Sequence, residues 1–437
     1  MKPRRPEVLI DPPVAATPVE LPFPAFFKPH RRTPIMLEMA ARAASSVPDA
    51  LAGITLNGVI HLEDNALAFV HSMLRLGLDP HRTTLFAKGA GYRYGNKAAV
   101  IRELQKWGVT VLAADEITPD YFHRVAELAL DRRDRLLFVE DGPFFGESLL
   151  NAPEIWPQVV GCLQQTTRGM PPYRNFKGPI GFPVLSLPDS ELKKLKEPPF
   201  IGKTFMRGLS AVFPHREWTN QKIAIFGSGA IGRAVGDAAS ALCMRPAFVD
   251  VSPRAQLLAD NICGELATPV DAARDAAVIA GFSGGVNGPS ITAEVLAAAP
   301  HGVIVASGSS ERFEVELAYL NSAGRARPLY IDGVPRSAKS RVGTIYTIGP
   351  RAKEIVLVND GWPLSFIGIP STTLPDQLAD FVMAMMLVGA IELGAGRFAD
   401  RKGIVTFTDG TDAVVPAIDK LADEWGIPSS YLRYWRA

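Results

Sequence analysis

The sequence predicts an α/β protein built from two Rossmann-like, doubly wound parallel-sheet domains, and three observations support this fold class. The chain of 437 residues is long enough for two or three domains. From Pro34 onward, short apolar runs alternate with helical stretches, which is the pattern of a parallel sheet flanked by helices. The apolar run Lys222–Phe226 is followed by Gly227, Gly229 and Gly232 in the spacing G-x-G-x-x-G, and then by an alanine-rich helical stretch.

The segments of the chain differ in composition. Residues 1–34 are rich in proline, which removes hydrogen-bond donors and disfavours helix, so we expect an extended arm. We expect a substrate and catalytic domain over residues 35–205 and 355–410, with a cofactor domain over residues 206–354 between them. Residues 411–437 are aromatic-rich, and burying one ring is worth about 2 kcal/mol. We therefore expect this tail to pack on a neighbouring subunit in a homodimer or homotetramer.

The first domain is expected to place two chemically active residues at strand ends. The expected strands are Ile54–Ile60, Thr83–Ala87, Val109–Ala113, Arg135–Val139 and Pro183–Leu187. The expected helices are Met36–Ala44, which precedes the first strand, and Asn65–Leu76, Lys97–Trp107 and Pro119–Leu130, which separate the first four strands. Ligands of parallel sheets bind beyond the carboxyl ends of the strands. His61 and Asp141 each follow such an end, so they are candidates for one shared crevice. A capping or loop role for each residue alone remains the alternative.

The glycine motif predicts a dinucleotide-binding turn. Gly227 permits the tight turn, Gly229 lets the backbone approach a pyrophosphate, and Gly232 lets the helix pack closely on the strand. The N-terminus of the following alanine-rich helical stretch, expected over Arg233–Cys243, offers free N–H groups and a positive dipole end to phosphates, and Ala230 and Ile231 of the loop are further expected cofactor contacts. A glycine-rich turn in another kind of α/β unit is the alternative.

A second apolar run ends at Asp250, about twenty residues past the glycines, where such units place a ribose-binding acid. A carboxylate there accepts hydrogen bonds from ribose hydroxyls and repels a 2′-phosphate, so the sequence favours NAD over NADP. The further expected strands of this domain are Ala276–Phe282, Gly302–Ser307 and Arg327–Ile331, with a hairpin region near Val342–Thr347 and a strand Glu354–Val358 that leads the chain back to the first domain.

The composition argues against a nucleic-acid-binding, secreted or membrane-spanning protein. Lys+Arg 46 and Asp+Glu 45 nearly cancel, so charge gives no reason to expect nucleic acid or an anionic membrane as a partner. Cys162, Cys243 and Cys263 are widely spaced and odd in number, which fits a reducing cytoplasm and matches neither a metal site nor a disulfide framework. The N-terminus has no apolar core of a secretory signal. Phe381–Leu393 is too short to span a bilayer and contains Glu392, which predicts a buried helix.

These motifs, in this order, resemble the S-adenosylhomocysteine hydrolase (adenosylhomocysteinase) superfamily from about Pro34 to the C-terminus, at low identity. The residues that look like catalytic or NAD-contacting positions of that family are His61 in Val59-Ile60-His61-Leu62, Asp141 in Val139-Glu140-Asp141-Gly142, Thr166 and Thr167 after Gln165, Lys194, the loop Gly227–Gly232 with Asp250, and Ser283-Gly284. The resemblance implies a tightly held NAD that oxidises the 3′-hydroxyl of a ribose. The ketone then acidifies the adjacent C4′–H, a 5′ substituent is eliminated or added, and NADH restores the alcohol. It also implies that His61 and Asp141 act as acid and base and that Lys194 assists deprotonation of the alcohol.

The substrate side departs from the family. Gln165 replaces a glutamate, and the residues after His61, which include Glu63, differ from those that the family uses on adenine. Ser309 lies where the family has Gly-His-Phe, and Ser365 stands for an asparagine. A polar site built for one substrate rejects another when its donors and acceptors change, so this departure predicts a different substrate.

We therefore expect a cytoplasmic, NAD-dependent enzyme acting on a nucleoside- or sugar-like small molecule. It would oxidise a secondary alcohol transiently to enable elimination, cyclisation or epimerisation. Three alternatives remain at this point. They are genuine S-adenosylhomocysteine hydrolysis in a rearranged pocket, an inactive NAD-binding homologue with a regulatory role, and a dehydrogenase that releases NADH.

Overall fold

The structure is a computed structural model, which describes residues 21–407 apart from residues 90, 91, 94, 133, 254, 256–263, 286, 310 and 370–375. The expected aromatic tail and most of the expected arm therefore lie outside the described residues. Of the arm, Pro29–Arg32 forms the short helix α1, Pro34 begins α2 (Pro34–Ser46), and Phe27 is buried in the first lobe. This end of the expected arm is thus folded onto the domain that follows it.

The first sheet has seven strands, all parallel, in the order β15-β6-β5-β4-β1-β2-β3. Its strands are β1 (Ile54–Ile60), β2 (Thr83–Ala87), β3 (Thr110–Ala113), β4 (Arg135–Glu140), β5 (Val159–Gln164), β6 (Pro183–Ser186) and β15 (Gly403–Val405). The strand order reverses direction along the sheet, as in doubly wound folds. The α/β, Rossmann-like class predicted from the sequence is confirmed.

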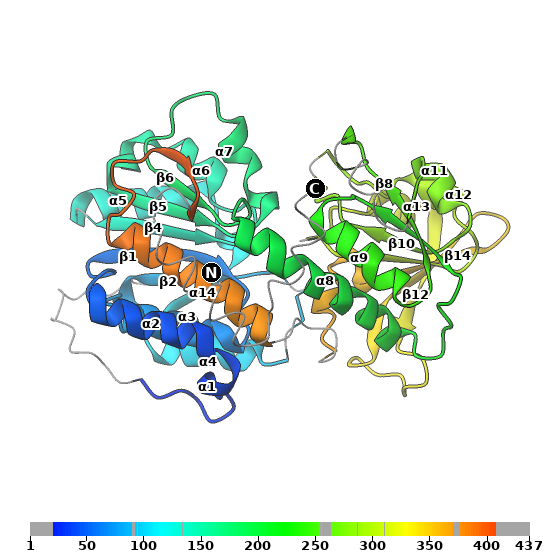
Figure 1. Ribbon diagram of the computed structural model, residues 1–437, viewed down its shortest axis with the longest axis horizontal. Coiled ribbons are helices and arrows are strands. Elements are labelled where there is room, and N and C mark those ends of the chain that lie inside the picture. Colours follow the sequence, from blue (N-terminus) through cyan, green and yellow to red (C-terminus); the bar gives the residue numbers. More distant parts are fainter. Residues whose placement is uncertain are drawn as a thin grey trace, which may run out of the picture.

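Helices cover both faces of this sheet (Figure 1). The helices on one face are α2, α3 (Asp64–Leu74), α4 (Lys97–Lys106) and α14 (Asp376–Gly394). The helices on the other face are α5 (Pro119–Arg132), α6 (Gly146–Leu150) and α7 (Pro171–Asn175). The connections contain the 3-10 turns η1 (Pro80–Arg82), η2 (Ala114–Glu116), η3 (Pro153–Gln158) and η4 (Thr167–Gly169). Along β4, Leu137 and Val139 join the core under α3 and α14, whereas Leu136 and Phe138 join the core under α5 and α6. Both faces are apolar because a strand's side chains alternate between two covered faces.

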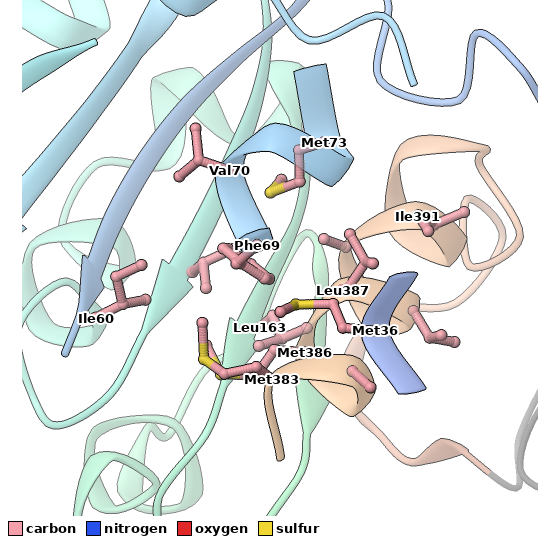
Figure 2. Packing of buried hydrophobic residues seen from close by; sticks show 14 of the residues in the cluster. Met36, Ile60, Phe69, Val70, Met73, Leu163, Met383, Met386, Leu387 and Ile391 are labelled. Atoms are coloured by element: carbon pink, nitrogen blue, oxygen red, sulfur yellow. The ribbon is translucent and has the colours of Figure 1, made fainter. Parts of the chain in front are cut away.

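Helix α14 is the buried helix that the sequence predicts. Phe381 is fully buried, and Glu392 is only 4% exposed. Figure 2 shows Met383, Met386 and Leu387 of α14 gathered with side chains from α2, α3 and β5. Asp380, also on α14, accepts hydrogen bonds from the first backbone N–H groups of α2, at Ile35 (2.7 Å) and Met36 (3.0 Å). Within the described residues, no helix combines the length with the apolar character that crossing a membrane requires.

The second sheet has eight strands in the order β12-β13-β14-β11-β10-β7-β8-β9. Its strands are β7 (Lys222–Phe226), β8 (Arg245–Val249), β9 (Glu265–Leu266), β10 (Ala276–Gly281), β11 (Val303–Ser307), β12 (Gly324–Tyr330), β13 (Arg341–Ile348) and β14 (Lys353–Val358). Strand β13 runs antiparallel to both neighbours, so the sheet is mixed at this edge and parallel elsewhere. Helices α8 (Glu191–Val212) and α9 (Ala230–Ser240) cover one face, and α11 (Pro269–Ala273), α12 (Ala293–Ala298) and α13 (Leu317–Ala323) cover the other.

The chain passes between the two lobes through α8, which Figure 1 shows running from one lobe to the other. A Cβ added at Gly202 of α8 would lie 2.3 Å from the carbonyl oxygen of Ala234, so glycine is what lets α8 approach α9 this closely. The chain returns after β14 through η5 (Asn359–Gly361) and η6 (Leu364–Phe366) and rejoins the first sheet with α14. The return expected at residue 355 is therefore too early, because β14 pairs with β11 and β13 inside the second sheet.

Candidate functional site

The centre of the candidate site is three side chains that follow three adjacent strands. His61 follows β1, Lys88 follows β2, and Asp141 follows β4. Because β4, β1 and β2 are neighbours in the sheet, their carboxyl ends meet at one edge. The backbone N–H of Asp141 donates to the carbonyl of Val59 (2.9 Å), which extends the β1–β4 ladder to the catalytic candidates.

These three side chains form a compact charged cluster. His61 Nε2 lies 2.8 Å from Asp141 Oδ2, and Lys88 Nζ lies 2.9 Å from the same oxygen. Lys88 Nζ is also 3.3 Å from His61 Nε2. The side chains of Lys88 and Asp141 are 1% and 2% exposed, whereas that of His61 is 21% exposed. The imidazole is thus the member of the cluster that solvent or a ligand can reach.

Burial and the neighbouring charges set the ionisation of the cluster. Burial lowers the pKa of His61, and the ammonium of Lys88 lowers it further, against the attraction of Asp141. Burial alone would raise the pKa of Asp141, but Lys88 and His61 outweigh it and hold that pKa well below its usual range. At neutral pH the cluster therefore contains an aspartate anion, a lysine cation and a neutral imidazole.

Aromatic rings enclose the cluster. Phe366 stacks on the His61 ring, with 4.5 Å between centroids and 22° between planes. Tyr92 lies 5.0 Å from His61, and Lys88 Nζ lies 5.3 Å from the centre of the Tyr92 ring. Lys88 Nζ also lies 6.0 Å from the centre of the Phe144 ring. These rings exclude water from the lysine and strengthen its interaction with Asp141.

Behind Asp141, the side chain of Glu140 fixes the loop that follows β4. One carboxylate oxygen accepts hydrogen bonds from the backbone N–H groups of Phe144 (3.1 Å) and Phe145 (2.7 Å), and the other accepts from the Tyr173 hydroxyl (2.7 Å). Glu140 is fully buried, and burial raises its pKa to about 7 although these hydrogen bonds lower it. This arrangement positions both Asp141 and the Phe144 ring.

The glycine loop between β7 and α9 has the geometry that the sequence predicts. Gly227 has φ +103°, a conformation that favours glycine. A Cβ at Gly232 would lie 1.8 Å from the carbonyl oxygen of Gly227, so the helix can pack here only without a side chain. A Cβ at Gly229 would meet no atom of the described residues within 4 Å. Helix α9 begins at Ala230, followed by Ile231, so its free N–H groups border this open space.

Asp250 follows β8 and caps the glycine loop. Its Oδ2 accepts hydrogen bonds from the Ser228 backbone N–H (2.6 Å) and hydroxyl (3.1 Å), and Oδ1 accepts from the Ser252 N–H (2.9 Å). These bonds fix the carboxylate beside the glycine loop, at the strand end where dinucleotide-binding units place their ribose-binding acid. Arg233 donates to the carbonyl of Ser228 (2.9 Å) from the first turn of α9.

Two further loops border the glycine loop, and one buried carboxylate holds them together. Glu314 is fully buried and accepts hydrogen bonds from the Ser283 hydroxyl (2.7 Å), the Gly284 N–H (2.7 Å) and the Ser290 hydroxyl (2.6 Å). It also accepts from the hydroxyl of Ser309. Ser283 and Gly284 follow β10, and Ser309 follows β11, so Glu314 links the ends of two strands on the cofactor side.

The two lobes touch at the candidate site. Tyr92, on the loop that carries Lys88, donates to Glu311 Oε1 (3.0 Å) and accepts from the Glu311 N–H (3.0 Å). Glu311 lies on the loop after β11, beside the Ser309 position. Nearby, the Arg168 guanidinium of the first lobe lies 4.4 Å from the ring centre of Phe313 in the second. The charged cluster and the cofactor-side loops therefore face each other across one interface.

Lys194 does not join the cluster. Its side chain is 54% exposed and lies 3.8 Å from Asp189. The adjacent Lys193 is buried instead, and its Nζ donates to the carbonyl of Gln165 (2.6 Å). The register chosen from the sequence therefore places the wrong lysine inward, and Lys88 is the cation beside His61 and Asp141.

The remaining predicted residues lie around the site in different ways. Thr166 donates through its N–H (3.0 Å) and hydroxyl (3.3 Å) to the side chain of Gln164, and Thr167 begins the η4 turn. Glu63 precedes α3, where burial raises its pKa to about 7. Ser365 belongs to η6, next to the Phe366 ring that stacks on His61.

Sequence reasoning did not select Lys88, Tyr92, Glu140 or Glu314. Lys88 could have been found by the rule that selected His61 and Asp141, because it is the first residue after an expected strand. Glu140 and Glu314 carry no such signal. Their role comes from hydrogen bonds to loops that only the folded structure brings to them.

Comparisons with known proteins give distant similarities. No family model matches the chain. Uncharacterized proteins from two strains of Mycobacterium tuberculosis are each 27% identical over 344 residues, which are 73% of this chain and 60% of theirs. The chain thus spans less than two thirds of the length of these relatives.

Two solved structures also show weak similarity. A dipicolinate synthase chain from Bacillus halodurans is 13% identical, with a TM-score of 0.40, covering 78% of this chain and 98% of that one. The D-isomer specific 2-hydroxyacid dehydrogenase from Lactobacillus delbrueckii ssp. bulgaricus, in its NAD complexed form, is 11% identical with a TM-score of 0.34, covering 65% and 94%. At these values, function has to be inferred from the residues of the site.

Proposed function

We propose that this protein is an NAD-dependent enzyme that oxidises a secondary alcohol of a nucleoside- or sugar-like small molecule, with His61, Asp141 and Lys88 as its acid–base group. The observation that carries this proposal is the contact between Tyr92 and Glu311, at 3.0 Å. It joins the loop of the charged cluster to a loop at the cofactor side. An alcohol bound at this interface would have a proton acceptor on one side and the cofactor on the other.

The residues around the glycine loop fit NAD. The open space at Gly229 and the start of α9 suit a pyrophosphate, and Asp250 suits the hydroxyls of a ribose while repelling a 2′-phosphate. Ser283 and Gly284 would border the nicotinamide side of the cofactor, held in place by Glu314. When bound, NAD supplies a hydride acceptor for the alcohol carbon.

The charged cluster supplies proton transfer. The Nε2 of His61 faces the Asp141 carboxylate, which favours the tautomer with the proton on Nε2 and the lone pair on Nδ1. The neutral imidazole would accept the hydroxyl proton of the substrate at Nδ1, and Asp141 would stabilise the imidazolium that results. The buried Lys88 ammonium would keep Asp141 ionised and, by lowering the pKa of His61, keep the imidazole neutral before the proton is transferred.

The resemblance to adenosylhomocysteinases supports a transient oxidation, in which the alcohol is restored after elimination, cyclisation or epimerisation. The enclosed cluster is consistent with this order of events, because exclusion of water protects a reactive ketone. The changed positions Glu63, Gln165, Ser309 and Ser365 support a substrate other than S-adenosylhomocysteine. We propose that the enzyme works as a homodimer or homotetramer, as the aromatic tail suggests.

The proposal is tested by incubating the purified protein with NAD and a panel of nucleosides and sugars while the near-ultraviolet absorbance of NADH is recorded. A transient rise that decays without NADH release supports oxidation and restoration in place. A lasting rise identifies a dehydrogenase, and release of a homocysteine thiol identifies genuine hydrolysis. No signal with any compound, or an equal signal in His61→Ala, would contradict the proposal.

A further inference from the structure

A polar pocket lies next to the aromatic rings that surround the charged cluster. It has a volume of about 360 Å³ and is lined by Arg93, Arg312, Arg341, Thr344, Tyr346, Asp360 and Trp362. The Trp362 ring of this pocket packs edge-on against Tyr92, with 5.3 Å between ring centroids, and Tyr92 in turn packs against His61. Arg93 comes from the loop that carries Lys88, and the other lining residues come from the second lobe. The pocket therefore bridges the two lobes.

The pocket has an excess of positive charge. Its three arginines face one carboxylate, that of Asp360. Arg341 already binds Asp360 through both terminal nitrogens (3.0 and 3.2 Å), and the Thr344 hydroxyl donates to the same carboxylate (2.7 Å). Arg93 Nη2 lies farther from Asp360, at 3.6 Å from Oδ2. Three guanidinium groups thus surround one carboxylate, so two positive charges are in excess among the lining residues.

Among the three arginines, Arg312 is the one whose two terminal amino groups can donate hydrogen bonds to a ligand. Its Nε donates to the backbone carbonyl of Asp360 (3.0 Å), and its guanidinium lies 5.9 Å from the ring centre of Trp362. Within the described part of the chain, its two terminal amino groups have no hydrogen-bond acceptor. A guanidinium fixed at Nε presents these two groups as a fork, which suits the paired oxygens of a phosphate.

We propose that this pocket binds the phosphate group of a phosphate monoester, with Arg312 and Arg93 as the principal ligands and Trp362 as the wall for the organic part. A tetrahedral dianion matches the two excess charges, whereas a carboxylate would repeat the contact that Asp360 already makes. Because Arg93 and Arg312 belong to different lobes, the bound phosphate would hold the lobes together. This site does not depend on the proposed activity.

The test is isothermal titration of the full-length protein with inorganic phosphate and with phenyl phosphate, at constant ionic strength and with saturating NAD to occupy the glycine loop. We expect both ligands to bind and Arg312→Gln to weaken binding by about tenfold or more. The matched control is Arg325→Gln, an exposed arginine on β12 opposite Thr347, on the other face of the sheet from Thr344 and Tyr346. It should change binding by less than about twofold.

Three results would overturn the proposal. The first is equal binding by the Arg312→Gln variant, and the second is equal binding of acetate and phosphate. The third is binding that is seen in a parallel titration without NAD but not with NAD, which would place the ion at the glycine loop. If phenyl phosphate binds more tightly than inorganic phosphate, the natural ligand is an organic monoester, and equal affinity indicates the free ion. Because the readout is binding, failure of the proposed enzyme activity would leave this result interpretable.

Discussion

The ammonium nitrogen of Lys88 lies 2.9 Å from Oδ2 of Asp141, and both side chains are almost completely buried. Two charges taken out of water are stable only as a pair, because either one alone keeps its desolvation cost without compensation. The cluster at the ends of β1, β2 and β4 is therefore one electrostatic unit, and each member should be tested through its effect on the others.

Removing the negative charge should expose this dependence. Asp141→Asn leaves Lys88 buried without its anion, and we expect the free energy of unfolding to fall by about 3–5 kcal/mol, together with loss of activity. Denaturant unfolding monitored by circular dichroism measures the stability. Asp115→Asn, an exposed carboxylate in η2, is the control and should change stability by less than about 0.5 kcal/mol. Equal stabilities of the two variants would show that the ion pair is not buried as described.

Removing the positive charge should change the pKa of His61. Burial and Lys88 both lower that pKa, so Lys88→Met should raise it. The neutral imidazole is the active base, and activity falls as pH drops through its pKa. The acid limb of the kcat/KM profile should therefore move to higher pH in this variant. NMR titration of the imidazole, assigned with His61→Gln, checks the shift without substrate. Lys106→Met, an exposed lysine on α4, should leave it unchanged, and a downward shift in Lys88→Met would contradict the prediction.

Glu140 should make stability depend on pH. Its pKa in the folded protein is raised by burial to about 7 from an ordinary value of 4.5, so the folded state binds this proton more tightly than the unfolded state. The stabilisation is complete below pH 4.5 and is lost as pH rises through about 7. Glu140→Gln removes this titration, so its stability relative to the natural protein should rise over that range by on the order of 3 kcal/mol. Unfolding curves across this range measure the difference, and Glu154→Gln, which is exposed, should show none.

Two alanine substitutions in the glycine loop should affect different properties, the first NAD affinity and the second stability. At Gly229 a methyl group would meet none of the atoms that the structure describes, so the Gly229→Ala variant should fold normally. It should bind NAD at least about tenfold more weakly, because the methyl occupies the pyrophosphate space. At Gly232 the methyl collides with the Gly227 carbonyl, so Gly232→Ala should lose about 1–3 kcal/mol of stability. Thermal unfolding and calorimetric titration separate the two effects. Unchanged NAD affinity in Gly229→Ala would place the cofactor elsewhere.

The parts of the fold that local patterns specify could be predicted from the sequence. Strand β1 begins and ends where its apolar run does, and the positions after strand ends brought His61 and Asp141 together. The hairpin region expected near Val342–Thr347 falls on β13, which pairs antiparallel with its neighbours. The pairing partner of a strand is not a local property, which is why the sequence did not show that β14 belongs to the second sheet.

The errors at individual residues have the same origin. Lys193 and Lys194 are adjacent on α8, so they point about 100° apart around the helix axis. Only the packing of α8 decides which of them is buried, and it selects Lys193. Glu314 is likewise unremarkable in its own segment, and its importance comes from loops after two separate strands.

The decisive experiment is a crystal structure of the protein with NAD bound. We expect the pyrophosphate at Gly229 and the start of α9, the adenosine ribose at Asp250, and the nicotinamide ring in van der Waals reach of the His61–Lys88–Asp141 cluster. A nicotinamide ring that points away from His61, or a protein that takes up no NAD at saturating concentration, would contradict the proposed chemistry.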